Sequence, residues 1–352
     1  MNVHQLLSGA GPFDAITTET LVFRSHFRRW GWGGSDFAAR IAPGLGARIT
    51  PLHELTPDPQ DVLLLHHSAG APRLAELLAL PNPKLLLYHN ITPASWLWDH
   101  APLVAVHCAI GREQLPELVD AVDVAAADSE FNAAELRALG AERTEVIPLL
   151  LDRERLAAPP DGAQRRDGPA TLLFVGRLSP HKRQDELIRA FSLYRRHRDP
   201  CARLRLVGDP ITPGYAELLR RLADTLAPGA VSIESSLPAA ALAQRYLEAD
   251  VFLCLSEHEG FCIPVLEAFQ FGVPVVARPV GGIPEVAGDA ALLVADSDLA
   301  VVSELVHLAV TDQPLREELR RRAQGPLAEF SPERVAARLR AAVEATAAAR
   351  SA

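Results

Sequence analysis

Short apolar runs alternate with amphipathic stretches along the whole chain. This alternation is typical of βαβ units, in which helices connect the strands of a parallel sheet. In the first half we predict strands at 3–7, 61–66, 84–89, 103–107 and 122–126. In the second half we predict strands at 171–175, 203–207, 230–234, 251–255 and 274–277. The pattern therefore predicts an α/β protein with two Rossmann-like, doubly wound parallel sheets.

A polar segment at 153–170, broken by several Pro and Gly residues, separates the two halves and is expected to be a linker. We predict one domain at 1–152 and a second at 171–330, which agrees with the usual domain size for a chain of 352 residues. The Ala-rich segment 331–352 starts with Ser331 and Pro332, which suit a helix cap and a first helical position. We expect a final helix there, packed back on the first domain. Ligands bind at the carboxyl ends of parallel strands, so a cleft between two facing domains is the expected site.

Composition excludes some functions. The chain has 35 Lys and Arg against 44 Asp and Glu, a net charge of -9, so no nucleic acid partner is expected. Cys108, Cys201, Cys254 and Cys262 lack metal-site spacing and are expected to be reduced, buried thiols. The 12 His residues include no pair at i and i+4, so we expect no metal. Without an apolar run of ~18 residues or a signal peptide, the expected location is the cytoplasm.

A glycine and two cations follow the strand at 171–175. Gly176 allows close approach of a ligand to the backbone, Arg177 can bind two phosphate oxygens, and Lys182 adds a point charge. The two cations could instead be solvated charges at a helix start, although positive charge there opposes the helix dipole. Gly208, after the next strand, is a weaker signal of the same kind. These residues predict a diphosphate site that works without a metal.

Two carboxylates follow the strand at 251–255. Glu259 lies in a polar loop, while Glu267 lies in a helix that Pro264 is expected to start and Gly272 to end. Backbone N–H groups at 263–266 would form an anion site at the helix start. The loop carboxylate could bind sugar hydroxyls and the helix carboxylate the two hydroxyls of a ribose. A solubility role is the alternative, but the apolar neighbours of Glu267 require it to have a partner.

The spacing Ser-x-x-Glu-Gly-Phe-x-x-Pro-x-Leu-Glu-Ala from Ser256 to Ala268 resembles the signature of the retaining glycosyltransferases of family four, the group-one class with the GT-B fold. The Gly176-Arg177-Leu178 turn with Lys182 is similar to the diphosphate clamp of that family. The resemblance implies a nucleotide-diphosphate sugar as donor substrate and no cofactor. It implies a catalytic set of Glu259, His89, Arg177 and Lys182. It implies a donor-binding set of Gly11, Gly176, Arg177, Lys182, Gly208, Gly260, Phe261, Ile263, Pro264, Val265 and Glu267. Cys262 replaces the second glycine of the family's Glu-Gly-Phe-Gly, which we expect to change the pocket shape only slightly.

The first half resembles a bacterial polysaccharide-related subgroup of the same family in its His-His-Ser and His-Asn-Ile-Thr-Pro segments, which contain His67 and His89. By this resemblance His89, at a strand end, contacts the donor. His67 is more typical of a polar residue whose hydrogen bonds are satisfied in the fold. Gly11 lies in a small-residue loop that would let a ligand approach the backbone.

Phe23, Phe27 and Trp30 recur at helical spacing beside Arg24, Arg28 and Arg29. A peripheral contact with the inner face of the plasma membrane, through this segment and through Trp96 and Trp98, is one reading. A core-facing helix with a solvated basic side is the reading we prefer.

The resemblance implies a function: transfer of a hexose, mannose or glucose, with retention, to a saccharide, a lipid-linked or a small-molecule acceptor in bacterial polysaccharide or glycoconjugate synthesis. A glycosidase also uses two carboxylates but needs no diphosphate clamp. A sugar-nucleotide epimerase and a non-catalytic sugar-nucleotide-binding protein stay open. A dinucleotide dehydrogenase is disfavoured because Gly-x-Gly-x-x-Gly is absent. The sequence gives no expectation for oligomeric state.

Overall fold

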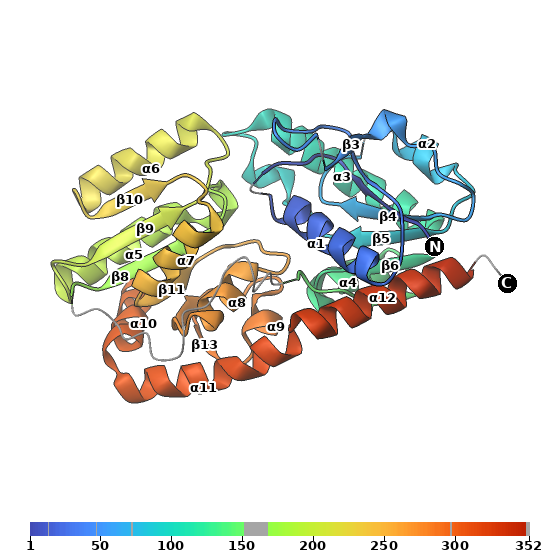
Figure 1. Cartoon of the computed structure of the whole chain (residues 1–352). Coiled ribbons are helices and arrows are strands. Elements are labelled where there is room, and N and C mark those ends of the chain that lie inside the picture. Colours follow the sequence, from blue (N-terminus) through green and yellow to red (C-terminus); the bar gives the residue numbers. More distant parts are fainter. Residues whose placement is uncertain (13, 47, 72, 151–167, 296–297, 350–352) are drawn as a thin grey trace. The chain divides into compact units, whose positions relative to one another are not determined.

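The computed structural model describes residues 1–349 except 13, 47, 72, 151–167 and 296–297. The chain divides into two compact units. The first unit comprises Met1–Ala94, Leu103–Leu150 and the carboxy-terminal segment from Ser331. The second unit comprises Ser95–Pro102 and the chain up to Phe330. Each unit is a parallel sheet with helices on its faces (Figure 1).

The first unit has a seven-stranded sheet in the order β3-β2-β1-β4-β5-β6-β7. Its strands are β1 (Val3–Leu7), β2 (Asp36–Ala38), β3 (Thr50–Pro51), β4 (Val62–His67), β5 (Lys84–Tyr88), β6 (Val124–Ala127) and β7 (Thr144–Val146). All neighbouring strands are parallel. The strand order reverses between β1 and β4, and such a switch point is where doubly wound sheets bind ligands.

Helices of the first unit cover this sheet. They are α1 (Ala15–Arg29), α2 (Leu74–Leu78), α3 (Pro102–Ala121), α4 (Glu130–Ala138) and α12 (Pro332–Ala349), with the short helix η1 (Leu52–Glu54). The carboxylate of Asp14 caps α1 by accepting a hydrogen bond from the Thr17 N–H at 2.8 Å. Helix α12 places Val335, Leu339 and Val343 in one core with Val62 and Leu85 of the sheet. The last described helix of the chain is therefore part of the first unit.

The second unit has a six-stranded parallel sheet in the order β10-β9-β8-β11-β12-β13. Its strands are β8 (Thr171–Val175), β9 (Arg203–Val207), β10 (Val231–Glu234), β11 (Val251–Cys254), β12 (Val275–Ala277) and β13 (Ala291–Leu293). Its helices are α5 (Gln184–His197), α6 (Pro213–Leu226), α7 (Ala239–Glu248), α8 (Ile263–Gln270), α9 (Ile283–Ala287), α10 (Leu299–Thr311) and α11 (Gln313–Glu329), with the short helices η2 (Ala94–Trp96) and η3 (Pro180–Lys182). The switch point lies between β8 and β11. Both predicted motifs of this unit follow these two strands.

One predicted strand is wrong, because residues 103–107 lie in helix α3. The apolar residues of this segment do not share a buried strand. Leu103 is 79% exposed, and Val104 and Val106 are also exposed, while Ala105 and Cys108 are buried. Burial every third residue is helical, and Pro102 supplies the first residue of the helix.

Two further expectations need correction. Cys201 is exposed, whereas the other three cysteines are free and buried as predicted. Arg24 does not join a solvated basic side, because its guanidinium is buried and binds Asp36 at 2.7 Å. Phe23 and Phe27 do face the core of the first unit, and Arg28 and Arg29 are exposed.

The predicted linker at 153–170 lies outside the described residues except for its last three positions. No helix among the described residues is long and apolar enough to cross a membrane.

Candidate functional site

Two glycines make the carboxyl ends of β8 and β9 fit together. Gly176 and Gly208 follow these strands with φ angles of +149° and +146°. A Cβ atom on Gly208 would lie 2.1 Å from the carbonyl oxygen of Gly176, so no other residue fits there. The predicted glycines therefore have a packing role at this edge. Because Gly176 and Gly208 have no side chains, neither residue covers the backbone of the Arg177 turn.

Lys182 and Glu259 form an ion pair at the switch point of the second sheet. The Nζ atom of Lys182, from η3 after β8, donates to Oε2 of Glu259, from the loop after β11, at 2.6 Å. The Glu259 side chain is 6% exposed and that of Lys182 is 19% exposed. Burial opposes the charged ammonium, but the Glu259 carboxylate outweighs this effect and raises the pKa of Lys182. Lys182 and Glu259, two predicted site residues from distant segments of the chain, are thus brought together.

A second ion cluster holds the two loops in place. The backbone N–H of Glu257 donates to the carbonyl of His181 at 2.8 Å, which ties the β11 loop to η3. The Glu257 carboxylate binds Arg183, and Arg278, after β12, donates to the Leu255 carbonyl at 2.8 Å. Arg278 also binds Glu186 of α5 at 2.6 Å. Glu257 is therefore a structural residue of the loop that carries Glu259.

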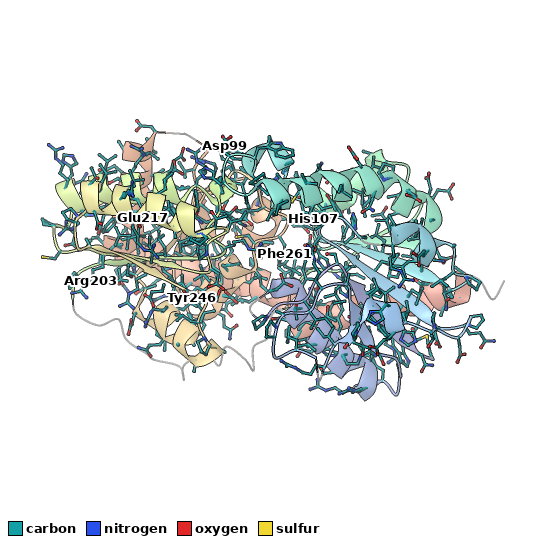
Figure 2. All side chains as sticks on the ribbon, turned by 90° about the horizontal axis from the view of Figure 1, so that it is seen from above. Asp99, His107, Arg203, Glu217, Tyr246 and Phe261 are labelled. Atoms are coloured by element: carbon teal, nitrogen blue, oxygen red, sulfur yellow. The ribbon has the colours of Figure 1, made fainter. Side chains whose placement is uncertain are left out.

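Glu267 has the buried partner that its apolar setting requires. The phenol of Tyr246, in α7, donates to Oε2 of Glu267 at 2.6 Å. Burial and then the nearby carboxylate raise the pKa of Tyr246 well above its usual value, so it remains a donor. Phe261 comes from the loop before α8 and packs edge-on against Phe330 at 5.4 Å between ring centroids; Figure 2 labels Tyr246 and Phe261. Sequence reasoning missed Tyr246, because nothing in its local pattern links it to Glu267.

Arg177 stands apart from the ion pair. It is exposed at the end of β8, and its guanidinium makes no ion pair with any residue that the structure describes. It is close enough to His181 to help lower the pKa of that histidine, after burial and Lys182. The remaining predicted donor contacts lie at the start of α8, where Pro264 is in the first turn as expected and Ile263 begins the helix. Gly260 precedes this start and Val265 is buried in it.

The Gly281-Gly282 turn packs against the backbone that carries the loop carboxylate. The Gly282 N–H donates to the Glu259 carbonyl at 3.2 Å. A Cβ atom on Gly281 would lie 1.8 Å from that carbonyl oxygen, and one on Gly282 would lie 2.2 Å from the Gly260 carbonyl oxygen. These two glycines thus set the position of Glu259 without contacting its side chain.

Cys262 occupies a left-handed conformation with φ of +71° at the amino-terminal cap of α8. Such a conformation favours glycine, which agrees with the family pattern that this chain departs from. Its thiol is buried beside Cys254, and the hydrogen bond with Cys254 and burial raise its pKa well above the usual value. The replacement of the family's glycine by Cys262 therefore places a neutral thiol next to Glu259.

We expect Cys262→Gly to fold with a stability within about 1 kcal/mol of the parent, because relief of the left-handed strain offsets the lost thiol packing. Cys262→Val should lose about 2 kcal/mol or more, because a β-branched residue tolerates this conformation poorly. Urea unfolding of both variants checks the difference. Equal stability of the two variants would contradict the conformational explanation.

In the first unit, His89 follows β5 directly and its side chain is only 2% exposed. Its ring stacks on that of His66, and the Nε2 atom of His89 lies 2.9 Å from Nδ1 of His66. Glu19 and Asp128 lie near its two nitrogens, at 3.6 and 3.7 Å. Burial lowers the pKa of His89, but Asp128 and Glu19 together raise it above the usual value. The ring nitrogens of His89 therefore face buried partners.

Glu19 is the residue of this cluster that sequence reasoning missed, because it lies in a helix among polar neighbours without a motif. Burial raises its pKa to about 8. His67 has a satisfied hydrogen bond to the Gly111 carbonyl at 2.8 Å, and burial lowers its pKa to about 4. Gly11 lies in the loop before α1, where its N–H donates to the Thr17 hydroxyl at 3.0 Å.

Residues 160–325 match the family model described as glycosyl transferases, group 1. The described residues of this segment lie in the second unit and include Arg177, Lys182, Glu259 and Glu267. This segment therefore resembles the group 1 glycosyl transferases, the family that the motifs around Lys182 and Glu259 resemble.

Curated relatives agree with this family. The D-inositol 3-phosphate glycosyltransferase of Actinosynnema mirum is 33% identical over 252 residues, which are 66% of this chain and 59% of the relative. The enzyme of that name from Geodermatophilus obscurus is 34% identical over 254 residues, 68% of this chain and 55% of the relative. The matches thus span between half and two thirds of the length of these relatives.

Solved structures share the fold of the whole chain. Sucrose-phosphate synthase from Thermosynechococcus elongatus superposes with a TM-score of 0.74 at 18% identity, covering 96% of this chain and 97% of that structure. HepE from Anabaena in complex with UDP-glucose superposes with a TM-score of 0.71 at 18% identity, covering 97% of this chain and 100% of that structure. The predicted GT-B fold class, with two parallel-sheet units, is confirmed.

Proposed function

We propose that the chain is a retaining glycosyltransferase that moves a hexose, glucose or mannose, from a nucleotide-diphosphate sugar to a saccharide, lipid-linked or small-molecule acceptor. The observation that carries the proposal is the ion pair between the partly buried Lys182 and the buried Glu259 at the switch point of the second sheet. A ligand entering that edge meets a cation, a carboxylate and the start of α8 together. The reaction would take place in the cytoplasm, in polysaccharide or glycoconjugate synthesis.

Different residues of the site would stabilise the leaving diphosphate and bind the sugar and the ribose. As the bond from the anomeric carbon to the diphosphate breaks, negative charge develops on the diphosphate oxygens. Lys182 and Arg177 stabilise that charge, and the N–H groups at the start of α8 add a fixed dipole. Glu259 binds hydroxyls of the sugar, and Glu267, oriented by Tyr246, accepts hydrogen bonds from the ribose. No side chain is assigned as a covalent nucleophile.

Lys182 must exchange partners when the donor binds. Its ammonium now binds Glu259 at 2.6 Å, and an incoming diphosphate would compete with that carboxylate for it. Release of Glu259 from Lys182 would leave the carboxylate to accept hydrogen bonds from the sugar. Donor binding would thus arrange both groups at once.

The acceptor has two candidate classes. The His-His-Ser and His-Asn-Ile-Thr-Pro segments favour a saccharide or lipid-linked acceptor of bacterial polysaccharide synthesis. The relatives named for D-inositol 3-phosphate favour a small phosphorylated polyol as the second candidate. For the donor, the bound UDP-glucose of HepE makes UDP sugars the first to test.

A thermal-shift screen followed by product analysis tests the function. UDP, GDP and ADP sugars are each added to the full chain, since a ligand at 100 times its Kd stabilises the native state by about 2.7 kcal/mol. The stabilising donor is then incubated with oligosaccharides, a lipid-linked sugar and D-inositol 3-phosphate. Transfer with retained anomeric configuration supports the proposal. Hydrolysis of a glycoside, conversion of the donor to an epimer, or binding without turnover would each replace it with the corresponding alternative.

A further inference from the structure

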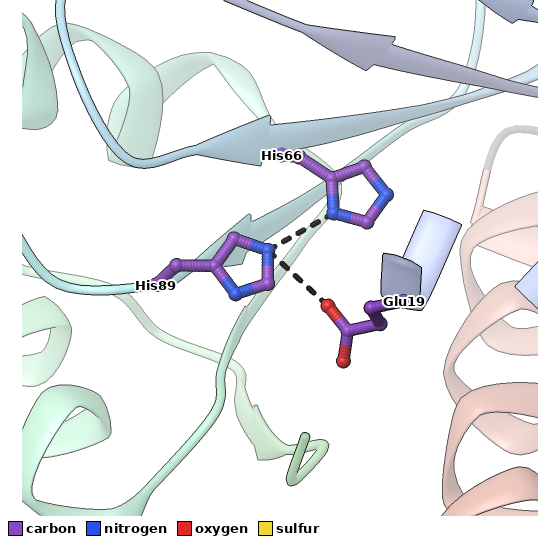
Figure 3. A group of neighbouring side chains, drawn as sticks. All are labelled: Glu19, His66 and His89. Carbon is purple, nitrogen blue, oxygen red and sulfur yellow. Dashed lines mark hydrogen bonds and ion pairs between the residues drawn. The ribbon is translucent and has the colours of Figure 1, made fainter. Parts of the chain in front are cut away.

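Each unit contains a compact cluster of buried acid, histidine or cysteine side chains among its described residues. The cluster of the first unit, drawn in Figure 3, consists of Glu19, His66 and His89. Its members are partners of one another, since Nε2 of His89 lies 2.9 Å from Nδ1 of His66 and 3.6 Å from Oε2 of Glu19. These groups exchange protons but do not form covalent bonds with each other. The cluster of the second unit differs because it contains two thiols.

The two thiols, Cys254 and Cys262, lie beside the loop carboxylate. Cys254 ends β11 and Cys262 caps α8, and their sulfur atoms lie within 4.8 Å of each other and of a Glu259 oxygen. A hydrogen bond joins the two thiols, and the Cys254 thiol also donates to Oε1 of Glu259 at 3.9 Å. The other oxygen of Glu259 binds the Lys182 ammonium, so the charge of this carboxylate is already balanced. The thiol pair is the feature that donor binding does not explain.

The backbone on the two sides of this pair differs in its freedom to move. Cys254 is held in the sheet by its pairing with Ala277 of β12. Cys262 lies outside the sheet, at the end of a loop, in a left-handed conformation that residues other than glycine adopt at a cost. A bond between the two sulfurs would therefore be reached by rotation of the Cys262 side chain and a shift of its loop.

The acidities of the two thiols suit them to different steps of an oxidation. The hydrogen bond from Cys262 lowers the pKa of Cys254, although burial opposes this effect. The same hydrogen bond, together with burial, raises the pKa of Cys262 well above its usual value. Because the thiolate is the nucleophile, Cys254 is the thiol that attacks an oxidant. Both side chains are buried, with 1% and 8% of their surface exposed, so the oxidant must be small.

We propose that Cys254 and Cys262 are a site of reversible oxidation, at which hydrogen peroxide converts the two thiols into a disulfide. The Cys254 sulfur attacks one oxygen of the peroxide, the O–O bond breaks, and a sulfenic acid and one water are formed. The Cys262 sulfur then bonds to the Cys254 sulfur, and the sulfenic hydroxyl leaves as a second water with the Cys262 proton. Two electrons from the thiols thus reduce one peroxide to two waters, and a dithiol reductant reverses the change.

The disulfide would alter the loop that carries Glu259. It closes residues 254–262 into a ring, removes the thiol hydrogen bond to Oε1 of Glu259 and draws the start of α8 toward β11. Both groups bind the donor in the proposed function, on which this consequence rests, whereas the modification itself does not depend on that function. Oxidation should therefore lower the affinity for the donor.

Disulfide mapping of the full chain tests the modification. The chain is reduced, freed of reductant, treated with hydrogen peroxide, alkylated and cleaved by a glutamyl endopeptidase, which cuts after Glu257 and Glu259. We expect two peptides joined through residues 254 and 262, which dithiothreitol separates. The affinity for UDP-glucose, measured by calorimetric titration, should fall on oxidation by about tenfold or more, the cost of one lost charge-assisted hydrogen bond, and should recover with dithiothreitol.

Two variants separate this site from the other thiols of the chain. Cys262→Gly should keep its affinity for UDP-glucose after peroxide treatment, because Cys254 then has no second thiol to join. Cys201→Ser removes an exposed thiol of the same unit and should stay as sensitive to peroxide as the parent. Should Cys262→Gly fail to fold, Cys262→Ser replaces it, and the joined peptides of the parent chain still decide the modification.

Absence of the joined peptides after oxidation, or an equal loss of affinity in Cys262→Gly, would overturn the proposal. Unchanged affinity for UDP-glucose in a chain that carries the disulfide would overturn its effect on the donor site. A reduced chain that binds no UDP-glucose would count against a UDP-sugar donor, while the joined peptides would still support the oxidation site.

Discussion

Replacing Glu259 with Gln should lower kcat for sugar transfer by about two to three orders of magnitude, the usual cost of losing one preorganised electrostatic group. The change keeps the size of the side chain but removes the charge that pairs with Lys182 at 2.6 Å. Binding of the nucleoside diphosphate should change by only a few fold, because Glu267 and the start of α8 are intact. Steady-state kinetics and calorimetric titration of the diphosphate measure the two effects.

Glu217→Gln is the matched control for that variant. Glu217, labelled in Figure 2, is an exposed carboxylate of α6 that pairs with Arg221 of the same helix at 2.9 Å. It has the same chemistry and unit as Glu259 but no contact with the switch point, so kcat should not change. Transfer by Glu259→Gln within threefold of the parent rate would remove this carboxylate from the mechanism.

Replacing Gly281 with Ala should destabilise the second unit by about 3–5 kcal/mol, among the largest effects expected of a single substitution. The added Cβ would lie 1.8 Å from the Glu259 carbonyl oxygen and 2.9 Å from its carbon, so one of the two loops must move. The φ angle of +56° adds a conformational cost for alanine. The midpoint of urea unfolding, followed by circular dichroism, measures this loss.

Gly214→Ala provides the comparison, since a Cβ there meets no atom within 4 Å. Gly214 lies in the first turn of α6, where alanine is the better helix former, so a small gain of about 0.5–1 kcal/mol is expected. Similar losses from the two substitutions would show that the contact with Glu259 does not determine the effect.

Much of the fold could be predicted, because strand-length apolar runs and helical periodicity are local signals. The four consecutive apolar residues at 85–88 are buried in β5 as expected. The failure at 103–107 came from a run whose exposed Leu103 and Val106 gave it the composition of a strand. Very short strands such as β2 and β3 were missed, since their length carries little periodicity.

The candidate site was predictable where its chemistry lies beside a strand end. Lys182 and Glu259 were expected at one edge, and neighbouring parallel strands bring them together. Residues that act through tertiary contact were not found: Tyr246 binds Glu267 from another helix, and Glu19 reaches the two histidines from α1. A buried partner in another element leaves no mark on the local pattern, so only the folded arrangement identifies it.

Helix α12 has a consequence for how the chain acquires its structure. Val335, Leu339 and Val343 complete a core that also contains Val3 and Phe27, more than three hundred positions earlier in the chain. During synthesis on the ribosome, β1 and α1 must therefore wait, with part of their apolar surface uncovered, until α12 has been translated. The second unit, most of which is one continuous segment that precedes α12, is free to fold first.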